Sequence, residues 1–136
     1  MMDAFAAYHP ALIVLALWAL TIMVLSGLSL RGRTDADLCA CGTPKRDYAN
    51  PVYRRHRAFQ NAIETSGPFL AASLAAILTG ASPLLVNGLC VVFWLSRIVM
   101  AYVHVATENQ SMRSMAYGIG WLCMVALALT AIIAAL

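Results

Sequence analysis

One long stretch near the start of the chain carries no charge, and it constrains the fold more than any other feature. No Asp, Glu, Lys or Arg occurs between Asp3 and Arg31. At about 1.5 Å of helix rise per residue, this interval exceeds the roughly 30 Å hydrocarbon core of a bilayer. We therefore expect a membrane-spanning helix over residues 9–30. A cleavable signal peptide is less favoured, because signal peptides begin with basic residues and have a shorter apolar core.

The composition agrees with a membrane environment. Of the 136 residues, 62% are hydrophobic and 11% are charged, whereas soluble domains carry roughly 25% charged residues. Such a chain cannot cover a surface that faces water, which argues against a soluble globular protein, a disordered tail or a nucleic-acid-binding protein. The length suits one domain, and we expect residues 1–136 to form a single membrane domain with lipid as its main solvent.

Most of the charge lies in one loop after this first span. Residues 31–57 hold seven basic and three acidic side chains, which is ten of the fifteen charges in the chain (nine basic and six acidic). Gly42, Pro44 and Pro51 prevent a continuous helix there. Basic residues accumulate in cytoplasmic loops, so we expect loop 31–52 in the cytosol and both termini on the other side. The absence of a clear targeting extension favours a bacterial inner membrane.

Three further apolar segments predict three more spans, over residues 53–78, 84–106 and 113–136. An uncharged turn, residues 79–83, joins the second span to the third, so these two should be antiparallel neighbours. The predicted fold class is all-α, an integral membrane four-helix bundle with up-down topology. Small residues are frequent in the second and fourth spans, and they permit close contact between helices in lipid.

The four cysteines fall into two groups. Cys90 and Cys123 lie in apolar spans, where we expect them to be buried packing residues. Cys39 and Cys41 lie in the loop, which offers too few further ligands for a zinc site, and no metal site is predicted. Because the loop is expected in a reducing compartment, we expect these two thiols to be reduced.

Three charged residues remain inside or at the mouth of apolar segments: Glu64, Arg97 and Arg113. An ionisable side chain at the centre of a membrane helix costs at least about 2.5 kcal/mol, so such residues usually face the protein interior and mark a functional site. Glu64 and Arg97 could instead neutralise one another as a structural ion pair. Arg113 could be an end residue that reaches the membrane surface.

Helical spacing groups these charges with other polar side chains. At 100° per residue, each of the last three spans carries a polar stripe toward its cytosolic end; these stripes are Arg57, Gln60, Asn61 and Glu64, then Arg97 and His104, then Arg113, Ser114 and Tyr117. One cavity could collect all three stripes. Guanidinium groups bind carboxylates, and an arginine beside a thiol favours its thiolate. Glutathione fits this chemistry as one candidate among several.

The polar stripes also carry a family resemblance. The sequence RAFQNAIET at residues 57–65, followed by PFL at 68–70, resembles the second-helix signature of the membrane-associated proteins in eicosanoid and glutathione metabolism (MAPEG). Arg97 and the segment RSMAY at residues 113–117 match the same family. They are most similar to its branch of microsomal prostaglandin E synthase and microsomal glutathione transferase. The resemblance covers residues 53–136, and the first span agrees only in character.

This resemblance implies a homotrimer with a glutathione site between neighbouring subunits near the cytosolic face. It implies glutathione-dependent conjugation, peroxide reduction or isomerisation of a lipophilic substrate from the bilayer. Arg113 would stabilise the thiolate, with Ser114 beside it and Tyr117 in contact with the ligand. The residues implied in glutathione binding are Arg31, Arg57, Gln60, Asn61, Glu64, Arg97, His104, Arg113 and Tyr117.

The sequence also departs from the prostaglandin synthase pattern. Gln60 stands where that branch has arginine, Phe59 and Met100 where it has histidine, and His104 where it has tyrosine. These differences favour a glutathione transferase or peroxidase over an isomerase of the prostaglandin E synthase type. Two other classes stay open, a non-catalytic lipid-binding scaffold and a small four-span transporter. Such transporters usually have an acidic group in the first helix, and residues 4–30 contain none.

Overall fold

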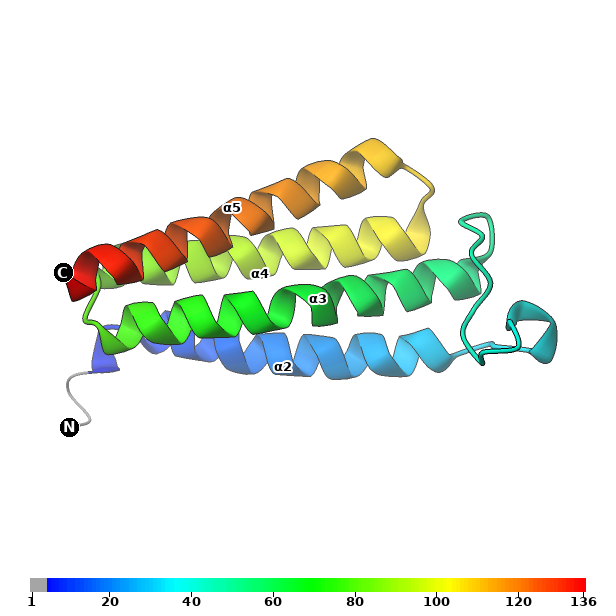
Figure 1. Cartoon of the computed structure of the whole chain (residues 1–136), viewed down its shortest axis with the longest axis horizontal. Helices are drawn as coiled ribbons and strands as arrows, with labels where there is room; N and C mark the ends of the chain where they lie inside the picture. The colour runs from blue at the N-terminus through cyan, green and yellow to red at the C-terminus, as the bar shows by residue number, and fades with distance from the viewer. Residues whose placement is uncertain (1–4) are drawn as a thin grey trace.

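The computed structural model describes residues 5–136, which fold as four long helices joined end to end. They are α2 (His9–Leu30), α3 (Pro51–Leu78), α4 (Pro83–Ala106) and α5 (Gln110–Ala135). Successive helices run in opposite directions (Figure 1), so the start of α2 and the end of α5 lie at one end of the bundle and the loop of residues 31–50 projects from the other. The predicted all-α fold with up-down topology is confirmed, and the predicted spans differ from the helices by three residues at most.

The helix starts follow from residues that satisfy or replace free backbone N–H groups. Pro51 and Pro83 open α3 and α4, at positions where a missing N–H costs nothing. Asn50 caps α3 by accepting a hydrogen bond from the N–H of Val52 at 2.8 Å, and Asn109 caps α5 by accepting one from Met112 at 3.1 Å. Proline at the first position explains why α3 begins two residues earlier than the sequence predicted.

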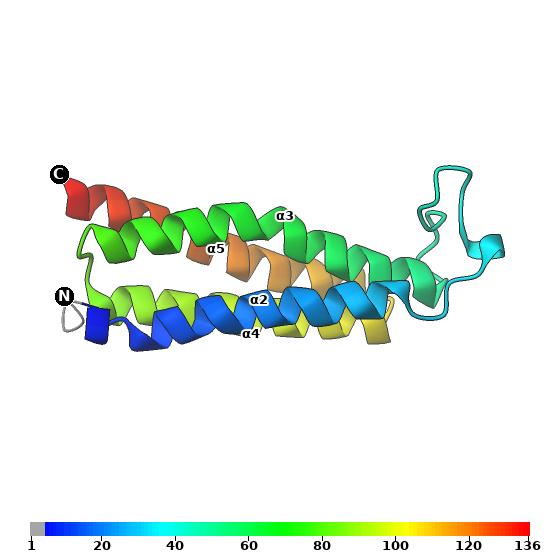
Figure 2. The ribbon, with the colours of Figure 1, turned by 90° about the horizontal axis from the view of Figure 1, so that it is seen from below.

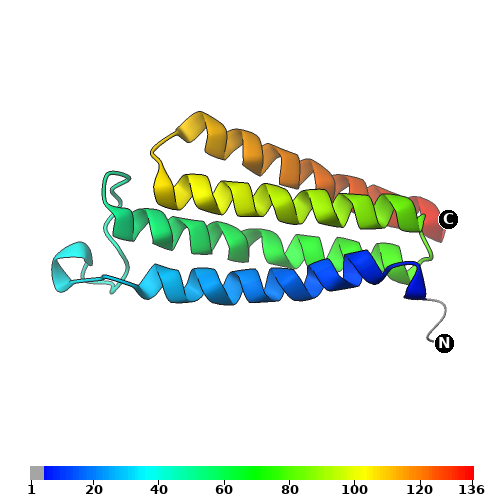
Figure 3. The ribbon, with the colours of Figure 1, turned by 180° about the vertical axis from the view of Figure 1, so that it is seen from behind.

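The helices pack with α3 and α4 in the middle. Each of these two contacts the other and also both α2 and α5, and the views from the front and from behind place α2 and α5 on opposite sides of the pair (Figures 1 and 3). An aromatic cluster joins three helices: the ring of Phe69 stacks on Phe93 with centroids 3.7 Å apart, and Trp18 meets both rings edge-on. Trp18 also donates a hydrogen bond to the hydroxyl of Ser66 at 3.1 Å. Such directional contacts hold helices together where lipid provides no hydrophobic driving force.

Three helices of the described chain, α2, α4 and α5, are long and apolar enough to cross a membrane. The helix α3 was predicted as a fourth span, but its composition is less apolar than that of the others. Its first half carries three arginines and Glu64, which explains the difference. The helix α3 lies alongside the three apolar helices over their length (Figures 1 and 2). Since α3 begins at the loop, its polar first half lies at the end of the bundle that carries the loop.

The loop of residues 31–50 is itself ordered by local hydrogen bonds. Its 3₁₀ helix η1 (Asp35–Asp37) is closed by Asp37, whose carboxylate accepts hydrogen bonds from the N–H and hydroxyl of Thr34 at 2.9 and 2.7 Å. The same carboxylate accepts a bond from the Asn50 amide at 2.8 Å. These bonds hold the pKa of Asp37 below its usual value, with the Asn50 bond as the largest cause. Asp37 therefore ties the start of the loop to the cap of α3.

The loop cysteines correct one expectation. Cys39 and Cys41 form a disulfide rather than two reduced thiols. Residues 38–44 fold back as a small hairpin, in which the N–H of Cys39 bonds the carbonyl of Thr43 and the N–H of Gly42 bonds the carbonyl of Cys39, both at 2.9 Å. Gly42 adopts φ +77°, which other residues rarely do. This turn leaves the cysteine Cα atoms 5.2 Å apart, a separation that a disulfide spans. Cys90 and Cys123 are buried, as predicted.

Candidate functional site

A polar cavity lies at the loop end of the bundle, between α3, α4, α5 and the loop. Its volume is about 440 Å³, and it is lined by Arg46, Tyr48, Asn61, Met100, His104, Glu108, Gln110, Arg113, Ser114 and Tyr117. Five of the residues singled out in the sequence meet here: Asn61, His104, Arg113, Ser114 and Tyr117. A volume of this size falls within the range of about 300–1,000 Å³ that is usual for small-molecule sites.

Arg113 is the main cation of the cavity. It sits in the first turn of α5 with 9% of its surface exposed, and its guanidinium carbon lies 4.2 Å from the centroid of the Tyr48 ring. No carboxylate within residues 5–136 forms an ion pair with it, and its Nη1 atom has no hydrogen-bond partner there. A buried cation without a counterion favours the binding of an anion.

Asn61 and His104 form the inner wall of the cavity. Both are buried, and Nδ2 of Asn61 lies 3.2 Å from Nε2 of His104. An amide nitrogen can only donate, so Nε2 accepts and the neutral imidazole carries its proton on Nδ1. That Nδ1 is also buried and has no partner in the described part of the chain. The cavity thus contains two buried donors, on His104 and Arg113, that a ligand could satisfy.

The loop closes the cavity on its outer side. The carbonyl oxygens of Tyr48 and Ala49 accept hydrogen bonds from Nη1 of Arg54 at 2.8 and 3.0 Å, and this same atom forms an ion pair with Glu108 at 3.2 Å. The Tyr48 ring covers Arg113 and also stacks on His104, with centroids 6.5 Å apart. Arg54 therefore fixes Tyr48 over the two buried donors.

Arg97 is buried outside the cavity, with 2% of its surface exposed. Its Nη2 atom donates to the backbone carbonyls of Ala116 and Tyr117 on α5, at 2.8 and 2.9 Å. A Cβ atom at Gly120 would lie only 2.5 Å from this Nη2, so the guanidinium occupies the space that the glycine leaves open. The suggested Glu64–Arg97 ion pair does not form. Helical spacing predicts which residues share a face of one helix, but it does not predict how that helix is rotated relative to its neighbours.

Three polar residues of α3 form a separate cluster beside the cavity. Arg57 donates to the side-chain oxygen of Gln60 at 2.9 Å and forms an ion pair with Glu64 at 3.6 Å. The side chains of Arg57 and Glu64 are 27% and 55% exposed. Asn61 shares the predicted stripe with them but turns toward His104. One stripe of the sequence therefore serves two different surfaces.

A second hollow, of about 450 Å³, runs between α3 and α5 toward the middle of the bundle. Glu64 and Tyr117 line it together with mostly apolar residues, namely Thr65, Pro68, Ala71, Ala72, Trp121, Met124, Val125 and Ala128. Tyr117 lines both this hollow and the polar cavity, so its side chain borders both spaces. We call this space the α3–α5 hollow.

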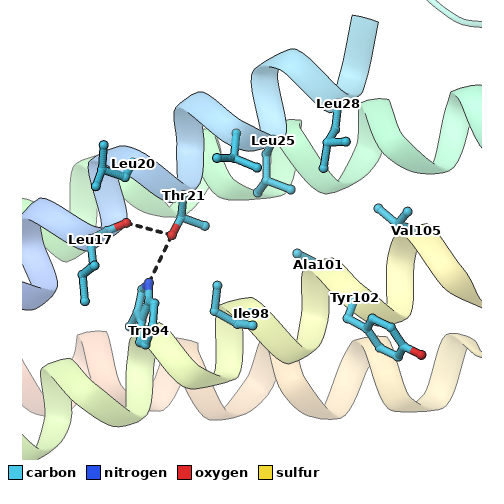
Figure 4. Close-up of a pocket in the computed structure, with 11 residues that line it drawn as sticks. Leu17, Leu20, Thr21, Leu25, Leu28, Trp94, Ile98, Ala101, Tyr102 and Val105 are labelled. Carbon is cyan, nitrogen blue, oxygen red and sulfur yellow. Dashed lines mark hydrogen bonds between the residues drawn. The ribbon is translucent and has the colours of Figure 1, made fainter. Parts of the chain in front are cut away.

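A third hollow faces the opposite side of α4. The α2–α4 groove has a volume of about 470 Å³ and is lined by Leu17, Leu20, Thr21, Val24, Leu25, Leu28, Trp94, Ile98, Ala101, Tyr102 and Val105. The side chains of α2 and α4 face each other across it (Figure 4), and its polar bonds are internal: Trp94 donates to the Thr21 hydroxyl at 3.1 Å, which donates to the Leu17 carbonyl at 2.8 Å. The remaining lining is apolar and suits a hydrocarbon chain.

The sequence predicted some site residues and missed others. Arg31 lies exposed at the end of α2 and does not line the cavity. The lining residues missed were Arg46, Tyr48, Glu108 and Gln110, and Met100 was noted only as a departure from a family pattern. The first two lie in the loop, where no periodicity indicates which side chain faces inward. Their proximity to the start of α3 was the only available signal.

One comparison with known proteins bears on this site. The model of the MAPEG family matches residues 7–133, a range that includes all the residues that line the polar cavity. No curated protein matches the chain. The family match and the three apolar helices together support an integral membrane protein with a role in glutathione chemistry or lipid metabolism.

Proposed function

Since the chain belongs to the MAPEG family, we propose that it is a membrane-embedded glutathione transferase or glutathione peroxidase. The co-substrate is glutathione, and the second substrate is a lipophilic electrophile or hydroperoxide from the bilayer. We place the protein in a bacterial inner membrane with the loop of residues 31–50 in the cytosol, where glutathione is available.

The observation that carries this proposal is the unpaired guanidinium of Arg113. It is buried in the polar cavity without a carboxylate partner among the described residues. A thiolate would supply the missing negative charge, and a nearby guanidinium lowers the pKa of a thiol and so raises its reactive fraction. The other lining groups suit the rest of glutathione: Arg46 can bind a carboxylate, Glu108 an ammonium, and Asn61 and His104 the peptide amides.

In the proposed mechanism the protein mainly stabilises charge. Arg113 holds the thiolate at the cavity end of α5, and the hydroxyl of Ser114 or Tyr117 donates a hydrogen bond to it. Tyr117 borders both the cavity and the α3–α5 hollow. An apolar substrate held in this hollow would reach the thiolate without crossing water. Arg97 is a positioning residue, because it binds the backbone of α5 at Tyr117 and touches neither space.

We also propose that the active form is a homotrimer. In one subunit, the α3–α5 hollow exposes the Glu64 carboxylate along a helix that packs among apolar spans. A charge facing lipid is costly, so a second copy of the chain is expected to cover this face. Five residues of the predicted list lie outside the cavity. Arg97 binds the backbone of α5, and the other four, Arg31, Arg57, Gln60 and Glu64, would contact glutathione across the subunit interface.

The decisive experiment is a glutathione titration of the purified protein, read by the ultraviolet absorbance of the thiolate. Wild type should give a saturable thiolate signal, and Arg113→Ala should lose it. Turnover of a chloronitrobenzene-type electrophile and of an organic hydroperoxide should fall by about 10²–10³-fold, as expected when one anion-stabilising donor is removed. Arg33→Ala is the matched control, because this arginine binds the backbone carbonyl of Ser29 and does not line the cavity. Equal signals in wild type and Arg113→Ala would falsify the proposal.

The α2–α4 groove favours a second candidate, a non-catalytic lipid-binding scaffold. Its apolar lining and position away from the polar cavity suit an acyl chain that takes no part in catalysis. The same titration separates the two functions. A protein that binds a fatty acid in detergent but gives no thiolate signal with glutathione would be a scaffold.

A further inference from the structure

The hairpin of residues 38–44 carries a feature that the proposed transferase does not use. Its disulfide joins Cys39 and Cys41 at the surface of the loop, where Cys41 is exposed and Cys39 half-buried. The other two cysteines are buried in the helices. Exchange with a thiol requires access to a sulfur atom. Within the described chain, the hairpin is therefore the place where a dissolved thiol can reach a cysteine sulfur.

The disulfide contributes little to holding the hairpin together. It links residues only two positions apart, and closing so short a loop removes little freedom from the unfolded chain. The hairpin is held independently by the backbone bonds between Cys39, Thr43 and Gly42 and by the pairing of Leu38 with Pro44. The bond can therefore open and close while the surrounding backbone keeps its shape.

The surroundings of the two sulfur atoms favour exchange. The hydroxyl oxygen of Thr43 lies 3.3 Å from Sγ of Cys39 and 3.0 Å from Sγ of Cys41. Disulfide sulfur has no hydrogen, so the hydroxyl is the donor. It could donate equally to whichever sulfur leaves as a thiolate, and Lys45 and Arg46 follow directly with positive charge. Hydrogen-bond donors and cations lower the energy of a thiolate and make it a better leaving group.

We propose that Cys39 and Cys41 form a thiol–disulfide exchange site for glutathione, separate from the polar cavity. A glutathione thiolate attacks Sγ of exposed Cys41; the Cys39–Cys41 bond breaks, and its electron pair leaves on Cys39, stabilised by Thr43 and then protonated by water. A second glutathione thiolate attacks the glutathione sulfur of the mixed disulfide. Glutathione disulfide is released, and Cys41 leaves as a thiolate that water protonates. Two glutathione molecules are oxidised and one protein disulfide is reduced, and glutathione disulfide reverses the sequence.

The hairpin is also connected to the wall of the cavity. The N–H of Lys45 bonds the carbonyl of Asp37 at 2.8 Å, and Asp37 binds Asn50. Between these two anchors lie Arg46 and Tyr48, which line the cavity. Neither anchor involves the disulfide, so both persist when the bond opens. We therefore expect exchange at the hairpin to leave this wall of the cavity in place and not to depend on the proposed transferase activity.

The experiment equilibrates the purified full chain with glutathione and glutathione disulfide at a series of ratios, blocks free thiols with a maleimide and measures intact mass. We expect a reversible transition between zero and two accessible thiols. Cys39→Ser should trap one glutathionyl group on Cys41, and Thr43→Val should slow reduction several-fold. Cys90→Ser is the matched control, because it removes a buried thiol and should leave the transition unchanged.

Two results would overturn the proposal. One is a disulfide that resists glutathione in the folded protein and reacts only after denaturation; the other is a thiol pair that glutathione disulfide does not oxidise. Arg113→Ala separates this idea from the transferase. If the cavity of this variant binds no glutathione but its hairpin still exchanges, the exchange site is independent of the role of Arg113 in the transferase reaction.

Discussion

Replacement of Gly120 by alanine gives a stringent test of the packing between α4 and α5. In the helix interior this change should on its own stabilise the protein by up to about 1 kcal/mol, because alanine is the better helix former. Here the added Cβ would lie 2.5 Å from Nη2 and 2.8 Å from Cζ and Nε of Arg97. Arg97 is 2% exposed, and a shift of its guanidinium away from this Cβ would stretch the hydrogen bonds to its two carbonyl partners.

The expected cost follows from those two bonds. Hydrogen bonds from a charged group contribute roughly 1.5–3 kcal/mol each, so displacing the guanidinium costs about 3–5 kcal/mol after partial relaxation, comparable to the breaking of a buried charge pair. With the gain in helix propensity subtracted, Gly120→Ala should destabilise the protein by about 2–4 kcal/mol. The substitution adds a single methyl group, so a large cost would identify Arg97 as its cause.

The control is the same substitution in an Arg97→Met background. Methionine is unbranched and flexible, so it can fill most of the space without a charge. There, Gly120→Ala should cost nothing or be slightly stabilising, which makes the coupling energy of the pair at least about 2 kcal/mol. Equilibrium unfolding of the four proteins in mixed micelles of SDS and a neutral detergent measures this cycle. An equal cost of Gly120→Ala in both backgrounds would show that the glycine is needed for a reason other than Arg97.

Three further predictions concern the loop and the core. Tyr48→Phe keeps the ring over Arg113 and should preserve glutathione binding, whereas Tyr48→Ala should weaken the thiolate signal about two- to fivefold, as expected for the loss of a cation–π contact of about 0.5–1 kcal/mol; equal signals in both would exclude a role for the ring. The pKa of Asp37 is lowered by its bonds to Asn50 and Thr34. The carboxylate therefore stabilises the loop at pH values above the usual pKa of about 3.9, and this stabilisation is lost as the pH falls through the lower pKa of the folded protein. Exchange protection of the Thr34 amide should fall over that acidic range in wild type, and a flat pH profile like that expected for Asp37→Asn would contradict the assignment. Trp18→Ala removes the edge of the aromatic cluster and the bond to Ser66, and it should cost about 3–5 kcal/mol of unfolding free energy, against a much smaller cost for replacing exposed Trp121.

The helices were readily predicted because their signals are local. A run without charge, proline at the start of a helix and an uncharged turn each act within a few residues, and the bounds of α2, α3, α4 and α5 follow them closely. The pairing of side chains between helices was not predictable in the same way. Glu64 and Arg97 have opposite charges at similar depths, yet Arg97 binds backbone carbonyls and Glu64 pairs with Arg57 on its own helix.

The remaining features that were not predicted depend on contacts between residues far apart in the sequence. Gly120 belongs to a set of small residues that predicts only close helix packing, and its particular role depends on a guanidinium from α4. Tyr48 covers Arg113 because Arg54 holds its carbonyl and Asp37 ties the loop to Asn50. No period in the sequence connects these residues. The disulfide between Cys39 and Cys41 depends on the hairpin that brings the two residues together. The expectation of reduced thiols was based on the compartment of the loop and contained no information about this hairpin.

The marginal apolarity of α3 has a consequence for the biogenesis of the protein. A segment with Arg57, Asn61 and Glu64 in its first half would partition poorly into lipid by itself. A turn of only four residues, 79–82, joins it to the strongly apolar α4. We therefore expect α3 and α4 to leave the insertion machinery together as a helical hairpin, in which α4 shields the polar half of α3 before α5 has been synthesised.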